Sequence, residues 1–158
     1  MAAARRSRRQ RSGSATRQRL PRPDHPEHHF IIDPDKWDFY EMDAYRLLGD
    51  DERAATHARS VIRISTGPDG TEISPMRAAE ARLTLGVAAA RTGEIEEAVG
   101  MGTAALEANR KSLPSLLLVA DELDRELRSR YPREATARDF HEQITTIKRG
   151  AARPELPF

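Results

Sequence analysis

The chain has 158 residues, which fits one ordinary domain with a tail, and its formal net charge is only +1. It contains no cysteine, which excludes disulfides, thiolate nucleophiles and cysteine-ligated zinc or iron–sulfur sites. No apolar run approaches the roughly 18 residues that a membrane-spanning helix needs, so we expect no membrane span.

The near-neutral charge conceals an uneven distribution along the chain. The first 22 residues carry eight arginines and no acid, whereas the remainder has a net charge of −7. Residues 1–27 are also almost free of the large apolar side chains that a folded core requires. The sequence therefore predicts a disordered, Arg-rich tail followed by an acidic domain.

Three readings of the tail stay open. The tail is either a plain linker, or an organellar transit peptide, or a segment that binds the phosphates of a nucleic acid. In the nucleic-acid reading the contacts are made by Arg5, Arg6, Arg8, Arg9, Arg11, Arg17 and Arg19.

From residue 33 onward the apolar residues follow a helical period, and no clean period-2 run is present, so the fold class is predicted to be all-α. The pair Asp33-Pro34 is a typical helix start, and Gly49 is a typical end. The first helix is expected to turn one apolar stripe toward the core, formed by Trp37, Tyr40, Ala44 and Leu47.

The same reasoning predicts five more helices, separated by the TGPDG turn at 66–70, by Gly93, by the region before Ser112 and by Tyr131-Pro132. Their inward stripes are expected to be Ala54, Ala55, Ala58, Val61 and Ile62; Met76, Ala79, Leu83 and Val87; Ile95, Ala98, Val99, Ala105 and Leu106; Leu116, Leu117, Ala120, Leu123 and Leu127; and Ala137, Phe140, Ile144 and Ile147.

Two of the resulting helical pairs align with each other. Gly49 and Gly93 are each followed five residues later by an alanine, and the repeat spans 44 residues. These offsets are typical of a tetratricopeptide hairpin. We therefore predict three antiparallel helical hairpins in a tetratricopeptide-like right-handed solenoid over residues 28–149, with flexible residues 150–158 after it. Aromatic residues on several faces of the first helix suggest that an upstream hairpin, the tail or a second subunit covers it.

No catalytic motif is present, so the chain is predicted to be no enzyme and to need no cofactor. His25, His28 and His29 lie near Asp24 and Glu27, but in a proline-broken segment that offers no fixed ligand geometry, and we expect no metal site. His57 and His141 are expected to be plain surface residues.

The first helix of each hairpin lines the concave face of such a solenoid. Polar residues recur there at helical spacing and predict a groove for a partner or ligand. The alternative is that they are solvated side chains that pair along their own helices. The predicted groove consists of Lys36, Tyr40, Asp43, Arg46, Arg77 and Glu80.

Residues 28–54 (HHFIIDPDKWDFYEMDAYRLLGDDERA), 69–99 (DGTEISPMRAAEARLTLGVAAARTGEIEEAV) and 108–132 (ANRKSLPSLLLVADELDRELRSRYP) resemble the C-terminal region of actinobacterial helix-turn-helix transcriptional regulators of the XRE-like group. The resemblance implies a tetratricopeptide-like region that senses a signal or mediates oligomerisation. The helix-turn-helix domain of that family has no counterpart in this chain.

These observations together predict a cytoplasmic, non-enzymatic sensor or interaction module. Its expected partners are a protein or peptide, a small-molecule signal, and a second copy in a homodimer. DNA would be reached only through a missing upstream domain, or weakly through the tail. The alternatives are a nucleic-acid-binding protein that acts through the tail, and a truncated remnant of a helix-turn-helix regulator.

Overall fold

The computed structural model describes residues 33, 36–108 and 113–152. The chain divides into two units, Met1–Pro34 and Asp35–Phe158, and the fold below is that of the second unit. The predicted disordered tail 1–27 lies outside the described residues, as do residues 153–158 at the end of the predicted C-terminal tail.

The described residues form α-helices and no β-strand, which confirms the all-α prediction. A single isolated bridge between Thr66 and Glu72 closes the loop that follows the second helix. The helices are α1 (Trp37–Leu48), α2 (Asp51–Ile64), α3 (Pro75–Thr92), α4 (Ile95–Ala108), α5 (Leu113–Arg130) and α6 (Ala135–Ala151).

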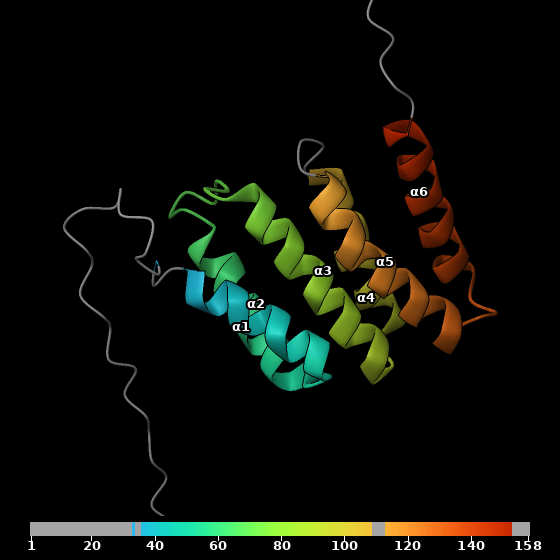
Figure 1. Cartoon of the computed structure of the whole chain (residues 1–158), viewed down its shortest axis with the longest axis horizontal. Helices are drawn as coiled ribbons and strands as arrows, with labels where there is room; N and C mark the ends of the chain where they lie inside the picture. The colour runs from blue at the N-terminus through green and yellow to red at the C-terminus, as the bar shows by residue number, and fades with distance from the viewer. Residues whose placement is uncertain (1–32, 34–35, 109–112, 153–158) are drawn as a thin grey trace, which may run out of the picture. The chain divides into compact units, whose positions relative to one another are not determined.

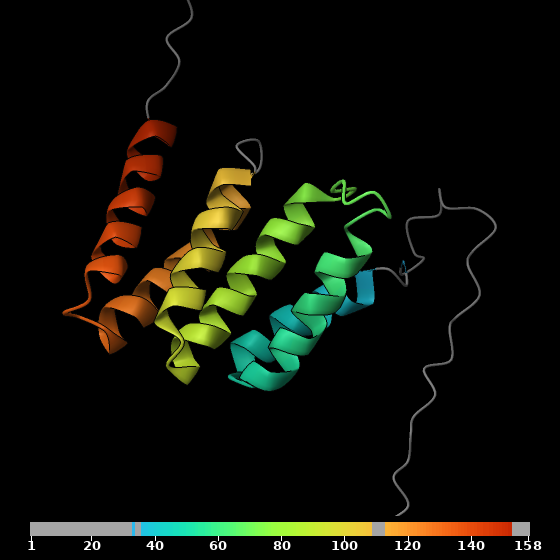
Figure 2. The ribbon, with the colours of Figure 1, turned by 180° about the vertical axis from the view of Figure 1, so that it is seen from behind.

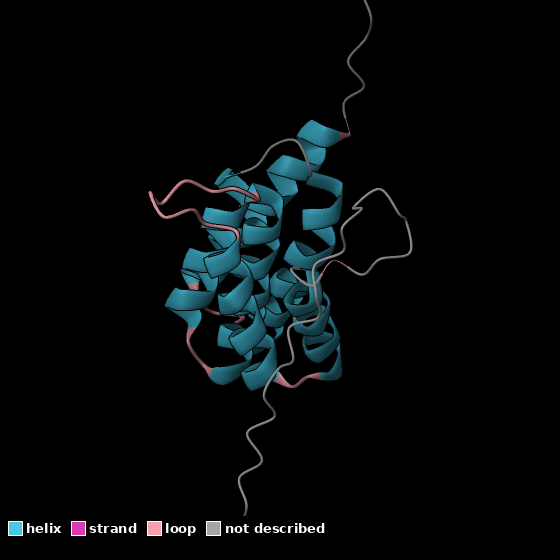
Figure 3. Cartoon of the chain, turned by 90° about the vertical axis from the view of Figure 1, so that its left-hand side faces the viewer, coloured by secondary structure: helices cyan, strands magenta, loops and turns pink. Residues whose placement is uncertain are grey.

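The helices of this unit lie in two layers. Figure 1 looks onto α1, α3 and α5, and Figure 2, from behind, brings α2, α4 and α6 to the front. Helix α3 contacts α1, α2, α4 and α5, and is therefore the central helix of the unit. The described loops lie at the ends of the helices (Figure 3).

Two glycines end helices at tight turns, as the sequence predicts. Gly49 follows α1 with a φ of 76°, and Gly93 follows α3 with a φ of 99°. Side chains with a β-carbon rarely adopt this left-handed conformation, so glycine is the favoured residue there. After the first turn, the Asp50 carboxylate accepts a hydrogen bond from the Arg53 amide and so caps α2.

The core consists of two clusters of buried side chains. The larger one is built by α3 to α6 around residues such as Leu83, Leu123 and Phe140. The smaller one joins α1, α2 and α3 through Met42 and neighbours such as Leu85. The predicted inward stripes of α2 to α6 are confirmed as buried or half-buried, except that Met76 is exposed.

Helix α4 approaches its neighbours closely at one glycine. A β-carbon on Gly102 would lie 2.6 Å from a Phe140 ring carbon and 2.7 Å from a Leu123 methyl group. On the same helix, Gly100 has nothing within 4 Å of that position. The absence of a side chain at Gly102 is therefore what lets Phe140 and Leu123 pack there.

The predicted orientation of the first helix is wrong. Trp37, Tyr40 and Leu47 are 51%, 57% and 75% exposed, and the adjacent Leu48 is exposed as well. The buried side of α1 instead carries Asp38, Met42 and Arg46. The physical reason is that the two charged residues on this side have partners on other helices, which offset the cost of burying them.

No helix among the described residues is long and apolar enough to cross a membrane.

Candidate functional site

A buried arginine joins α1 to α5 at the centre of the predicted groove. The Arg46 guanidinium donates to Asp43, with 2.7 Å between Nη2 and Oδ1, and also forms an ion pair with Glu122 on α5. Only 6% of Arg46 is exposed, and its Nε has no hydrogen-bond partner in the described structure. Charge-assisted contacts of this kind gain strength when water is excluded.

Glu80 of α3 lies beside this pair and is 8% exposed. Burial, together with repulsion from the nearby Asp43 carboxylate, raises the pKa of its carboxyl group to about 7. The positive charge of Arg46 acts in the opposite direction. Glu80 therefore carries its proton over much of the mildly acidic range and can share it with Asp43.

A second arginine forms the hub of the adjoining ion-pair cluster. Arg91, near the end of α3, contacts Glu126 at 2.9 Å and Asp51 and Glu122 at 3.0 Å. It also donates to the backbone oxygen of Arg46 at 3.1 Å. These four bonds tie α3 to α1, α2 and α5 at one point.

Glu126 joins this hub to an arginine at the surface. Its carboxylate accepts from both Arg91 and Arg130, each at 2.9 Å. Burial opposes ionisation of Glu126, but the hydrogen bonds from Arg130 and Arg91 outweigh it and lower the pKa of this carboxyl group. Glu126 is therefore held in its ionised form between the two arginines.

An open depression lies over the Arg91 hub. It is formed by the ends of α1 and α3 and by one side of α5, and Leu47 brings the exposed side of α1 to its edge. Its lining residues are Leu47, Arg91, Glu122, Arg125, Glu126 and Ser129. The depression therefore combines one apolar side chain with several charged ones.

The structure brings together three of the six residues predicted to form the groove, namely Asp43, Arg46 and Glu80. They are more enclosed than an open groove requires, since Arg46 and Glu80 are buried. Tyr40 is exposed on the outer side of α1.

The remaining two residues of the predicted groove, Lys36 and Arg77, are half-buried. Sequence reasoning missed Arg91 and Glu122 as members of the cluster. Charged residues that pair across distant helices leave no local pattern, so spacing alone could not reveal them.

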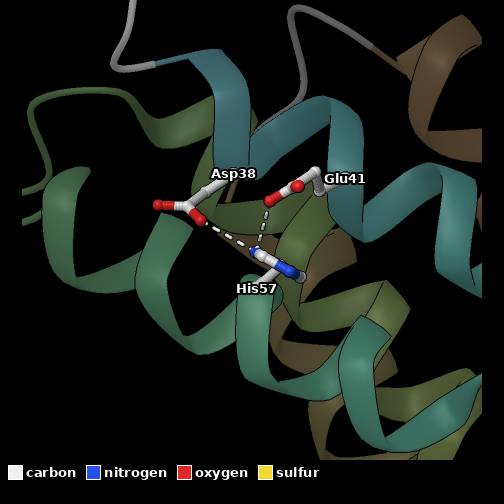
Figure 4. A group of neighbouring side chains, drawn as sticks. All are labelled: Asp38, Glu41 and His57. Atoms are coloured by element: carbon white, nitrogen blue, oxygen red, sulfur yellow. Dashed lines mark hydrogen bonds and ion pairs between the residues drawn. The ribbon is translucent and has the colours of Figure 1, made fainter. Parts of the chain in front are cut away.

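The expectation that His57 is a plain surface residue is wrong. Its Nδ1 lies 2.8 Å from Asp38 Oδ1 and 3.1 Å from Glu41 Oε2, and the histidine is 9% exposed (Figure 4). His141 also has a partner, since its Nδ1 lies 3.0 Å from an oxygen of the buried Asp124. Both histidines pair with carboxylates of neighbouring helices, which periodicity cannot show.

Other candidate residues of the sequence fall outside the described part of the chain. These are the arginines of the nucleic-acid reading and the cluster of His25, His28 and His29.

Comparison of the chain with protein-family models, with curated proteins and with solved structures finds no match. Functional inference therefore starts from the geometry of the site.

Proposed function

We propose that the chain is a non-enzymatic interaction module that binds a protein or peptide partner along α1. The observation that carries this proposal is the row of large exposed side chains on that helix. Trp37, Tyr40, Leu47 and Leu48 are each more than half exposed. Contiguous apolar side chains on a protein surface mark interaction sites, and aromatic residues contribute strongly to binding energy there.

The residues around this row favour a partner that carries both apolar and charged side chains. Leu47 belongs both to the row and to the edge of the depression over Arg91. Arg125, also exposed, lines the same depression and can pair with a carboxylate of the partner. An extended or helical peptide with apolar side chains and an acidic group fits this surface.

The resemblance to regulators of transcription supports a sensory role for the same surface. Short turns at Gly49 and Gly93 and the buried Ala54 and Ala98 fit a tetratricopeptide-like solenoid of three hairpins. In this proposal the module is cytoplasmic, and a small-molecule signal or pairing of two copies changes the access of the partner to α1.

A peptide-display selection against the full chain tests the proposal. Peptides that bind the wild type are expected to lose at least about 10-fold in affinity in the double variant Tyr40→Ser and Leu47→Ser, as interface anchors do. The control is Leu118→Ser, which removes an equally exposed leucine from α5. Circular dichroism checks the fold of each variant. Selected peptides that bind all variants equally would place the partner surface elsewhere.

Analytical ultracentrifugation of the same variants tests the homodimer. If two copies pair through α1, the wild type dimerises with rising concentration and the double variant stays monomeric. A dimer that persists in the double variant would show that copies pair through another surface.

A further inference from the structure

Two carboxylates and an imidazole converge between α1 and α2, outside the ion-pair cluster around Arg46 and Arg91. Asp38 and Glu41 lie one helical turn apart on α1, and His57 faces them from α2 (Figure 4). One ligand atom from each residue lies within 4.8 Å of the other two. The three atoms are close enough together for one metal ion to bind between the two helices.

The distances also fit a shared ion. His57 Nδ1 lies 2.8 Å from Asp38 Oδ1 and 3.1 Å from Glu41 Oε2. Around a metal with bonds of about 2.0–2.2 Å, neighbouring ligand atoms lie roughly 3–3.5 Å apart. These two distances therefore need to lengthen by only a few tenths of an ångström, and the two carboxylate oxygens lie within 4.8 Å of each other.

The surrounding residues hold two of the three groups in place. Ser60 donates to Asp38 Oδ2 at 2.8 Å, which fixes the carboxylate while its Oδ1 points toward His57. The Tyr45 ring stacks on the imidazole of His57, with ring centroids 5.5 Å apart and an angle of 12° between the ring planes. The Arg53 guanidinium lies over the Tyr45 ring, 5.3 Å from its centroid. Metal ligands are commonly oriented by such outer contacts.

We propose that Asp38, Glu41 and His57 bind a divalent first-row transition-metal ion, with Zn²⁺ the expected choice, through Oδ1, Oε2 and Nδ1. An imidazole nitrogen favours zinc and its neighbours in the periodic table over magnesium or calcium, which prefer oxygen ligands only. The ion binds the ring nitrogen in place of any proton there, and that proton is released to solvent. Three protein ligands leave one position of a tetrahedral ion for water.

The consequence for the molecule is a cross-link between α1 and α2. Helix α1 is the one that presents the exposed row around Tyr40, and Tyr40 lies between two of the ligands in the sequence. A bound ion therefore fixes the helix that carries this row. The metal site itself stands on its own geometry and does not depend on the proposed partner.

Isothermal titration of the untagged full chain with Zn²⁺ tests the site. We expect one zinc ion per chain at the helices, with affinity reduced by more than about 100-fold in Asp38→Asn and in Glu41→Gln, which keep the size of each side chain. Ser60→Ala, which removes an orienting contact, is expected to lower the affinity by about 10-fold. The matched control Glu52→Gln, on the exposed side of α2, should bind as the wild type does.

The histidines at positions 25, 28 and 29 could bind zinc separately, so the triple variant His25→Ala, His28→Ala and His29→Ala serves as a second control and is expected to retain the helical site. A second readout on the wild type uses NMR, where zinc should shift the ring resonances of His57. Absence of zinc binding, or binding that survives Asp38→Asn and Glu41→Gln but disappears in the triple variant, would overturn the proposal. In that case the three residues form only a proton-mediated link between helices.

Discussion

At the scale of single residues, Gly102 is a position where core packing leaves no room for a side chain. Alanine normally stabilises a helix relative to glycine, because glycine loses more backbone freedom on folding. At Gly102 the added methyl group would overlap Phe140 and Leu123, whereas at Gly100 it would meet open space.

We therefore predict that Gly102→Ala lowers the free energy of unfolding by about 1–3 kcal/mol, the usual cost of overpacking a core. Gly100→Ala should raise it by about 0.5–1 kcal/mol. Urea denaturation of both variants measures the difference. If the two substitutions changed stability in the same direction, α4 would not pack against Phe140 as described.

Glu80 makes the stability of the folded chain depend on pH. Its pKa is raised to about 7 in the folded chain from an ordinary value of 4.5. As the pH rises from 4.5, the unfolded chain releases this proton first, so the stabilisation present at low pH is lost by about pH 7.

Glu80→Gln keeps a neutral hydrogen-bonding group and should remove this dependence. We expect the variant to match the wild type near pH 5 and to exceed its free energy of unfolding by roughly 1–2 kcal/mol at pH 8, after allowance for solvent screening. Denaturation at both pH values measures this, with Glu142→Gln on the exposed side of α6 as the control. An equal gain at pH 5 and pH 8 would mean that Glu80 does not titrate in this range.

At the scale of helices, the side chain of Arg91 on α3 forms bonds to three other helices, α1, α2 and α5. Its removal leaves the carboxylates of Asp51, Glu122 and Glu126 close together without their shared cation. We predict that Arg91→Ala destabilises the chain by about 2–4 kcal/mol, since breaking a buried pair leaves charge uncompensated.

The matched control is Arg130→Ala, because Arg130 pairs with the same Glu126 but is nearly half exposed. Exposed pairs contribute little, so a loss below about 1 kcal/mol is expected. Thermal and urea denaturation compare the two variants. Comparable losses would show that Arg91 is no more important than an ordinary surface arginine.

The helices themselves were predictable because most of them bury one apolar stripe. In α5, for example, Leu116, Leu123 and Leu127 recur at helical spacing and are all fully buried. Helix α1 breaks this rule, since it buries Asp38 and Arg46 and exposes Trp37. Hydrophobic periodicity assigns charged residues to the solvent, and only the positions of their partners on other helices reverse that assignment.

The candidate site was predictable only in part for the same reason. Asp43, Arg46 and Glu80 could be grouped because the hairpin pattern places their two helices, α1 and α3, on the same face of the predicted solenoid. The pairing of Arg46 with Glu122, 76 positions later, and of His57 with Asp38, 19 positions earlier, depends on how the helices pack. A signal for the second pairing was present in the sequence, because Asp38 and Glu41 occupy one side of a helix that also carries Met42.

At the scale of the whole molecule, the members of both core clusters within the described part of the chain lie between Phe39 and Ile147. We therefore predict that deletion of residues 1–27 changes the melting temperature of the chain by no more than about 2 °C, the effect of a few tenths of a kcal/mol. Circular dichroism on heating measures this. A drop of many degrees would show that the first residues contribute to the stability of the helical unit.

The same deletion separates the two functional readings. Peptide binding along α1 should survive it, whereas binding to nucleic acid through the eight arginines should disappear. In the full chain, such nucleic acid binding would also weaken steeply with added salt, because bound cations are released from the phosphates. Fluorescence anisotropy with a labelled duplex, at low and moderate salt, measures this second activity.

Helix α3 contributes to both core clusters, with Leu83 and Val87 in one and Ala81 and Leu85 in the other. Opening of either half of the unit therefore exposes one side of α3 while the other side stays covered. Backbone amides of α3 should consequently exchange with deuterium only when both halves open, and more slowly than those of α1 or α6. In kinetic terms, the helical unit contains two parts that open separately and that both include α3. The more stable of these two parts limits the rate at which the α3 amides exchange.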